Sequence, residues 1–146
     1  MPNTVAHIGS CSFFGCTNLE EIQFSNNLQI IGDSAFDSCE SIKSITIPSS
    51  ISTIREGAFY NCKALEQLNI NEGITKIESS AFEGCKRIKD LTLPDSLKTI
   101  EADAFRNCTG IKNLNYSVNT KMDRDEFSGC IFEKITKRLA NNKEKQ

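Results

Sequence analysis

Residues 31–53 read IGDSAFDSCESIKSITIPSSIST, and this stretch holds the pattern that decides the fold. The pattern recurs at a step of 23 residues along most of the 146-residue chain. Two rows of equivalent residues show the step, Cys16, Cys39, Cys62, Cys85, Cys108 and Cys130, and Phe13, Phe36, Phe59, Phe82, Phe105 and Phe127, the last step in each being 22. A fixed period of about 20 to 50 residues is typical of a stacked solenoid. The sequence therefore predicts coils of about 23 residues that lie on one another.

Within this stretch the apolar spacing changes from three to two. Phe36, Cys39, Ile42 and Ile45 are three residues apart, which fits a tight helical turn. Ile45 and Ile47 then alternate around Thr46, as in a strand that Pro48 ends. A second aliphatic group follows, and its row runs through Ile8, Ile31, Ile54, Ile77, Ile100 and Met122. One such coil leaves apolar faces open, so the coils need their neighbours to fold.

The seven cysteines do not read as a disulfide framework. Six of them occur once per repeat at one position, and stacked coils give parallel Cα–Cβ vectors that do not suit a disulfide. We expect buried thiols that act as small apolar groups, and a row spreads the sulfurs too far for a metal site. Cys11 lies outside the row at a turn. It is predicted to be the most exposed thiol, either idle or available for an intermolecular disulfide.

The strand segments carry a known motif. They read L-x-x-I-x-F (19–24), I-x-x-I-x-I (42–47), L-x-x-L-x-I (65–70) and I-x-x-L-x-L (88–93), flanked by A-F-x-x-C and by I-P or L-P. Over residues 2–130 this resembles the BspA-like, treponemal-type class of leucine-rich repeats. The resemblance implies an α/β leucine-rich-repeat solenoid, a right-handed curved superhelix with a parallel sheet on the concave side and short strands and helical turns on the other sides. It also implies attachment or protein binding in surface proteins, with no shared catalytic residues.

Three segments are expected. Residues 1–130 form the repeat array, with a partial first repeat and then five to six coils. Residues 131–142 form a helical cap that finishes this end, because Phe132, Ile135 and Leu139 have helical spacing. Residues 143–146 form a disordered tail. At the other end, strand 19–25 presents an open edge. That edge is explained either by a missing upstream array or by edge-to-edge self-association into a homo-oligomer.

Strand residues between the inward ones point out of the concave face and are candidates for contact with a protein partner. They are Glu21, Gln23, Ser44, Thr46, Gln67, Asn69, Asn71, Asp90, Thr92, Asn113 and Asn115, in rows that also include Ser25, Pro48, Pro94 and Ser117. Amides and hydroxyls can hydrogen-bond a peptide or a sugar, although a solvated polar face would look the same. Phe14 and Tyr60 are further candidate contacts, since each follows an inward phenylalanine. Lys86, Arg87 and Lys89 are interpreted as ordinary surface charge.

Composition narrows the function classes. The net charge of −2 gives no support for nucleic-acid binding, and no apolar run approaches the ~18 residues of a membrane span. His7 is the only histidine, so no catalytic constellation is expected, and we expect no cofactor. The leading hypothesis is a protein-binding module in surface adhesion or partner interaction. The alternatives are an intracellular scaffold and a structural segment of a longer array. The expected location is the cell surface or exterior for a fragment of a longer protein, and otherwise the cytoplasm.

Overall fold

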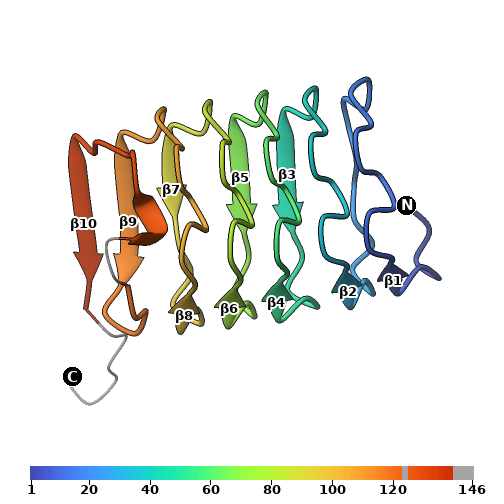
Figure 1. Ribbon diagram of the computed structural model, residues 1–146. Coiled ribbons are helices and arrows are strands. Elements are labelled where there is room, and N and C mark those ends of the chain that lie inside the picture. Colours follow the sequence, from blue (N-terminus) through green and yellow to red (C-terminus); the bar gives the residue numbers. More distant parts are fainter. Residues whose placement is uncertain (123–124, 140–146) are drawn as a thin grey trace, which may run out of the picture.

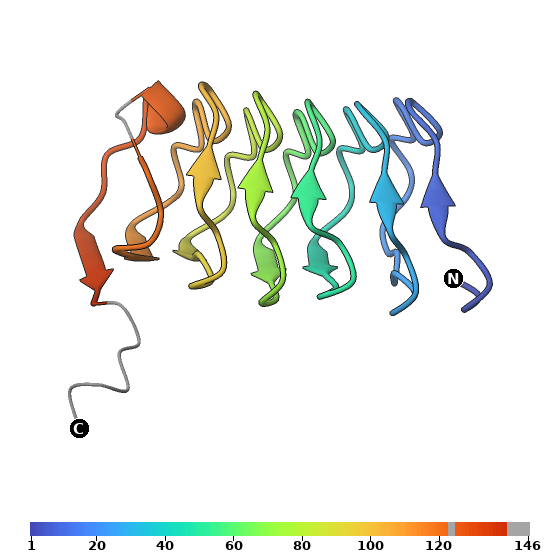
Figure 2. The same cartoon turned by 90° about the horizontal axis from the view of Figure 1, so that it is seen from below.

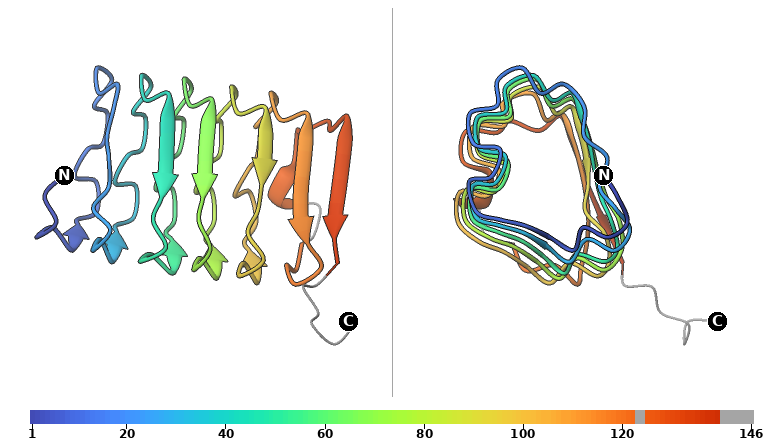
Figure 3. Two further views of the ribbon diagram at one scale, coloured as in Figure 1. Left: turned by 180° about the vertical axis from the view of Figure 1, so that it is seen from behind. Right: turned by 90° about the vertical axis from the view of Figure 1, so that its right-hand side faces the viewer.

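A computed structural model describes residues 1–122 and 125–139 of the chain. Its coils lie on one another around a common axis, and an end-on view shows their outlines nearly superposed (Figure 3). Equivalent strands pair in parallel at the repeat step, with Ile45 beside Leu68 and Ile54 beside Ile77. The predicted stack of 23-residue coils is therefore confirmed as a β-solenoid. Its right-handed curvature stays a prediction.

Strands occupy two sides of the stack. The long strands are β3 (Ser44–Ile47), β5 (Gln67–Ile70), β7 (Asp90–Thr92), β9 (Asn113–Ser117) and β10 (Lys134–Arg138) (Figure 1). β3 pairs with β5, and β9 lies between β7 and β10. The short strands are β1 (His7–Ile8), β2 (Ile30–Ile31), β4 (Thr53–Ile54), β6 (Lys76–Ile77) and β8 (Thr99–Ile100), which follow one another along a second side (Figure 2).

Helix is almost absent from the described residues, so the α/β part of the expected fold is not confirmed. The one helical element there is the 3-10 turn η1 (Asp125–Phe127). The segments with a step of three form turns, because two residues four positions apart have positive φ, such as Ser34 (54°) and Ser38 (60°). A right-handed helix cannot run through such residues. The amides of these serines bond to the next coil instead, Ser34 N to Glu56 O at 2.9 Å and Ser38 N to Tyr60 O at 2.7 Å.

The core is a file of phenylalanine rings with the cysteines beside it. Neighbouring rings from Phe13 to Phe127 stack with centroids 5.0, 5.4, 5.3, 5.2 and 5.1 Å apart. Each row thiol from Cys39 to Cys130 donates a hydrogen bond to the phenylalanine carbonyl of the preceding coil, for example Cys62 Sγ to Phe36 O at 3.2 Å. Cys39, Cys62, Cys85 and Cys108 are fully buried. The expectation of buried thiols is thus confirmed for the inner coils.

The first coil does not form the strand expected at 19–25. Residues 19–25 have no strand pairing, and the long-strand side begins at β3. Phe24 stands where later coils have Ile47 or Ile70, and its ring packs edge-on against Phe36 at 5.6 Å. A depression separates residues 20–23 from Lys43 and Ser44. We assign the absence of strand pairing at residues 19–25 to the side chain of Phe24, which is bulkier than the isoleucines at this position in later coils.

The expected helical cap is wrong where the structure describes it. Residues 134–138 form β10, which pairs with β9 along its length, and Ile135 lies beside Leu114. Phe132-x-x-Ile135 repeats the spacing Ile111-x-x-Leu114, and the open edge of β9 offers hydrogen bonds that a helix would leave unused. Among the described residues, this end also leaves apolar side chains uncovered, since Ile131, Ile135 and Leu139 are 81%, 57% and 70% exposed. Residues 140–142 of the expected cap and the tail 143–146 lie outside the described residues.

Candidate interaction face

The outward side chains of β3, β5, β7 and β9 form what we call the long-strand face. Strand alternation buries Ile45 and Ile47 and turns Ser44 and Thr46 toward solvent. The same alternation exposes or half-exposes the rest of the predicted set on these strands, Gln67, Asn69, Asp90, Thr92, Asn113 and Asn115. The structure therefore brings these eight predicted residues together on one surface.

Side chains on this face bond along the rows. Asn113 Nδ2 donates to Asp90 Oδ1 at 2.6 Å, and Asn69 Nδ2 lies 3.5 Å from Thr46 Oγ1. These contacts orient the amides of Asn113 and Asn69 across neighbouring strands. The face is an array of donors and acceptors that can bind a polar partner, and its eight residues include no nucleophile with an adjacent base.

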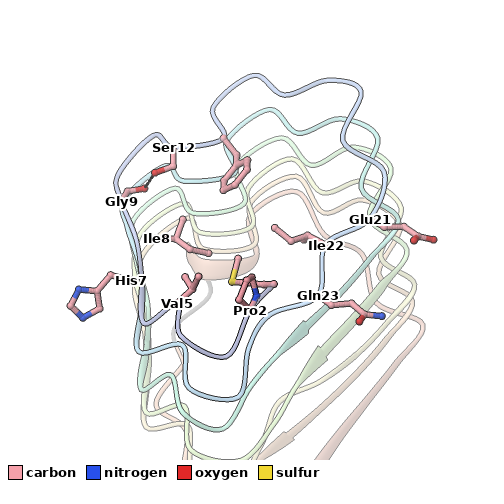
Figure 4. A pocket seen from close by; sticks show the side chains of 11 residues that line it. Pro2, Val5, His7, Ile8, Gly9, Ser12, Glu21, Ile22 and Gln23 are labelled. Carbon is pink, nitrogen blue, oxygen red and sulfur yellow. Dashed lines mark hydrogen bonds between the residues drawn. The ribbon is translucent and has the colours of Figure 1, made fainter.

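Glu21 and Gln23 belong to the unpaired first coil rather than to a strand. Both side chains are exposed, and they line a depression at the N-terminal end together with Ile22. Figure 4 shows Ile22 directed into the coil and Glu21 and Gln23 directed away from it. The structure thus places these two predicted residues beside the long-strand face, at the end of the stack.

The third row of the predicted face is mostly buried. Asn71 is exposed as expected, whereas Ser25, Pro48, Pro94 and Ser117 are buried. The chain already turns inward at this position. Ser117 Oγ accepts the amide of Asn119 at 3.1 Å, and Ser25 Oγ accepts that of Asn27 at 3.0 Å. Short polar side chains close such turns on themselves, so they were wrongly assigned to the face.

The other candidate contacts lie elsewhere. Phe14 is 57% exposed in a turn after β1, and Tyr60 is half-buried in the equivalent turn after β4. Cys11 is exposed, as predicted, at a turn with a positive φ of 57°. Lys86, Arg87, Lys89 and Lys112 line a shallow depression, where Glu66 lies 3.5 Å from Arg87. None of these residues joins the long-strand face.

Two other features are absent from the described ranges. Within 1–122 and 125–139, no three histidine, cysteine, aspartate or glutamate side chains are grouped as a metal ion requires. Over the same part of the chain, no helix has both the length and the apolar character to cross a bilayer.

Comparison with known proteins gives the family. Residues 1–112 and 76–143 match the model of the BspA type leucine-rich repeat region. The chain belongs to the BspA-type leucine-rich repeat family. No curated protein matches the sequence. The resemblance predicted from the A-F-x-x-C and L-x-x-L motifs is thus confirmed.

Solved structures share the architecture of this BspA-type repeat protein. A leucine-rich cell surface protein from Faecalibacterium prausnitzii is 25% identical, with a TM-score of 0.70 over 80% of this chain and 30% of its own. The leucine-rich repeat protein of T. pallidum is 24% identical, with a TM-score of 0.73 over 91% of this chain and 66% of its own. The likeness to the T. pallidum protein shows the fold of this chain alone. This chain therefore spans less than two thirds of either structure.

Arg138 is a residue of this BspA-type protein that the sequence reading missed. Its guanidinium donates to Leu93 O at 2.6 Å and Asp95 Oδ1 at 2.8 Å, and it also bonds to Asn115 Oδ1. These bonds hold β10 in place and orient the side chain of Asn115, the last predicted residue of the long-strand face. The sequence does contain a signal for this residue. Phe132-x-x-Ile135 repeats the strand spacing, and a strand in that register places Arg138 beside Ser117.

Burial sets the chemistry of the thiols in this BspA-type stack. Loss of water raises the pKa of Cys39 to about 12, and it also raises the pKa of Cys85, Cys108 and Cys130. A buried thiol with a raised pKa is a poor nucleophile at neutral pH, because the thiolate is the reactive form. These cysteines therefore suit packing rather than catalysis.

Proposed function

We propose that this BspA-type repeat protein is a non-enzymatic protein-binding module whose partner contacts the long-strand face. The observation that carries the proposal is the array of exposed amides, hydroxyls and one carboxylate on β3, β5, β7 and β9. Parallel main-chain bonds hold β3 in register with β5 and β7 in register with β9, so each pair is ordered before a partner arrives. Such order lowers the entropy cost of binding.

The chemistry of the face favours a protein partner. Gln67, Asn69 and Asn113 each carry a donor and an acceptor, which matches the paired groups of a peptide bond. Four strands at about 4.8 Å spacing give a face roughly 15 to 20 Å wide. That width suits a partner of modest footprint, below the roughly 800 Å² per side of a standard interface.

We further propose a surface-associated role in adhesion or partner interaction. Support comes from the Faecalibacterium prausnitzii protein, which is described as a leucine-rich cell surface protein. The second candidate is an intracellular interaction module. It is favoured by the exposed thiol of Cys11, because reducing compartments keep exposed thiols free. Labelling of intact cells with an impermeant reagent separates the two, since it marks the protein only in the first case.

Site-specific photo-crosslinking tests the face. A photoreactive residue replaces Asn69 on the face in one variant and Thr75 in the other, an exposed residue next to short strand β6. The two positions belong to the same coil but to different sides of the stack. We expect one defined protein to crosslink from Asn69 and not from Thr75. A partner captured equally from Thr75, or only from there, contradicts the proposed face.

A further inference from the structure

Both ends of the stack expose the inward positions of a coil. A cavity of about 740 Å³ at the N-terminal end is lined by Pro2, Val5, Ile8, Phe13 and Ile22, among others (Figure 4). A cavity of about 550 Å³ at the C-terminal end has a similarly apolar lining of Leu114, Tyr116, Met122, Phe127, Cys130, Phe132 and Ile135. Inside the stack, equivalent positions are covered by the next coil.

We propose that copies of the 146-residue chain associate head to tail, with the N-terminal end of one copy covering the C-terminal end of another. This contact is independent of the partner proposed for the long-strand face. It also differs from edge-to-edge pairing of two N-terminal ends. A head-to-tail contact that continues the stack leaves one free end on each side, so it produces short linear assemblies rather than dimers alone.

The repeat register fixes how the two ends would meet. β10 is the last strand of its sheet among the described residues, and it pairs Lys134 with Asn113 and Ile135 with Leu114. Glu21 and Ile22 lie at the same coil positions as Asn113 and Leu114, four repeat steps earlier. One more coil in the same register therefore places Ile22 of the second copy beside Ile135 and Glu21 beside Lys134.

Charge selects this pairing over a symmetric one. The contact sets Glu21 of the N-terminal end beside Lys134 of β10, and both side chains are exposed. Two N-terminal ends would bring Glu20 and Glu21 of both copies together, and two β10 strands would bring Lys134 and Lys137 of both copies together. Like charges at an interface cost energy, whereas opposite charges favour encounter and fix the register.

Two residues oppose the contact and keep it weak. In the same register Glu133 meets Glu20, which is a like-charge pair. Lys137 pairs with Tyr116 in the β9–β10 ladder and so takes an inward position with a charge. Inward charges on an edge strand limit pairing with further strands. We therefore expect association that grows with concentration and that strengthens when Lys137 becomes apolar.

The first test follows mass against concentration by sedimentation equilibrium of the full chain. We expect the average mass of the wild type to rise with concentration, and Lys137→Ile to associate about tenfold more tightly. Lys98→Ile is the matched control, because it creates an exposed isoleucine away from both ends, and it should behave as the wild type does. Monomers throughout for both wild type and Lys137→Ile overturn the proposal, as does equal strengthening by Lys98→Ile.

The second test swaps charges across the contact. We expect Glu21→Lys and Lys134→Glu each to weaken association about tenfold, and the double variant to recover most of the wild-type affinity. The recovery also shows that the single variants fold. Tighter association of Glu21→Lys with no effect of Lys134→Glu indicates pairing of two N-terminal ends, because the variant removes acid-acid repulsion, and it overturns the head-to-tail arrangement. Failure of the double variant to recover overturns it as well.

Discussion

At the residue scale, the stack depends on one thiol and one ring in each coil. Cys85 Sγ donates to Phe59 O at 3.2 Å, and Cys108 Sγ donates to Phe82 O at 3.1 Å. Each contact joins one coil to the preceding one inside the core. A cysteine meets two needs at this position, since it packs as a small apolar group and supplies a weak donor to a buried carbonyl.

Cys85→Ala should lower the free energy of unfolding by about 1 to 3 kcal/mol, because it removes the hydrogen bond and leaves a small cavity. Cys11→Ala is the control, since Cys11 is exposed and should change stability by less than about 0.5 kcal/mol. Urea unfolding of the two variants and the wild type measures both values. Equal stability of Cys85→Ala and the wild type would show that the thiol contact contributes nothing.

The buried thiols also predict how stability depends on pH. The pKa values of Cys39, Cys85, Cys108 and Cys130 are raised in the folded state by burial, whereas an unfolded thiol titrates near about 8.5. Above that pH the unfolded state binds fewer protons than the folded state, so the free energy of unfolding falls as pH rises. The loss is about 1.4 kcal/mol per thiol and pH unit, up to the folded pKa.

Urea unfolding over a series of pH values above neutral measures this slope. Cys85→Ala should have a shallower slope than the wild type, because one buried thiol is gone, and Cys11→Ala should keep the wild-type slope. Identical slopes for all three proteins would mean that the buried thiols do not control the alkaline loss of stability.

At the element scale, local spacing predicted some elements and misassigned others. Ile45-x-Ile47 and Leu68-x-Ile70 alternate as strands do, and both segments are strands. The step of three around Phe36 and Cys39 suggested helix, but the positive φ of Ser34 and Ser38 is set by bonds to the next coil. A coil-to-coil bond is not visible in a window of one repeat, which is why the turns were read as helical.

The C-terminal strand β10 is a second element that local spacing misassigned. Phe132, Ile135 and Leu139 fit a helix by spacing alone, whereas the unpaired edge of β9 favours a strand. Arg138 then reaches across two coils to Leu93 and Asp95. The role of Arg138 depends on the position of β10. It could not be predicted from a sequence pattern that indicated a helix at this segment.

Arg138→Ala should loosen β10 while leaving the inner coils intact. The variant loses three hydrogen bonds from a partly exposed guanidinium, and we expect the opening free energy of β10 to fall by about 1 kcal/mol. Hydrogen exchange of the amides at 134–138 should speed up, with exchange at 67–70 unchanged. Thr136→Ala changes another outward residue of β10 and is the control; faster exchange in that variant alone would contradict the role assigned to Arg138.

At the scale of the whole molecule, each coil is stabilised by both neighbours. Phe82 is fully buried between Phe59 and Phe105, whereas Phe13 stacks on Phe36 and is half-buried. The same substitution should therefore have a different effect at the middle and at the end. This gradient is a property of the stack and not of any one repeat.

Phe82→Ala should cost about 3 to 5 kcal/mol, the usual range for a buried phenylalanine, and Phe13→Ala about half as much. Urea unfolding followed by circular dichroism measures both costs, with Phe14→Ala as the control, because Phe14 is 57% exposed. Equal costs for Phe82→Ala and Phe13→Ala would contradict a stack in which contacts on both sides add stability.

The candidate face could be predicted only in part from the sequence. Alternation around Ile45 and Leu68 was enough to place Thr46 and Asn69 on one surface. It could not show that the chain turns inward at Ser117, where the side chain accepts the amide of Asn119. Nor could it show that residues 19–25 form no strand, because that depends on pairing with the next coil.

The most direct test of the account measures how tightly two matched double variants bind the partner that crosslinking identifies. Asn69→Lys with Thr92→Lys places two charges on the long-strand face, and Thr75→Lys with Thr109→Lys places two on exposed residues outside it. Calorimetric titration should show at least about tenfold weaker binding for the first pair, which is a loss of about 1.4 kcal/mol, and wild-type binding for the second. Unchanged affinity of the face variant, or an equal loss in both, would contradict the claim that this face binds the partner.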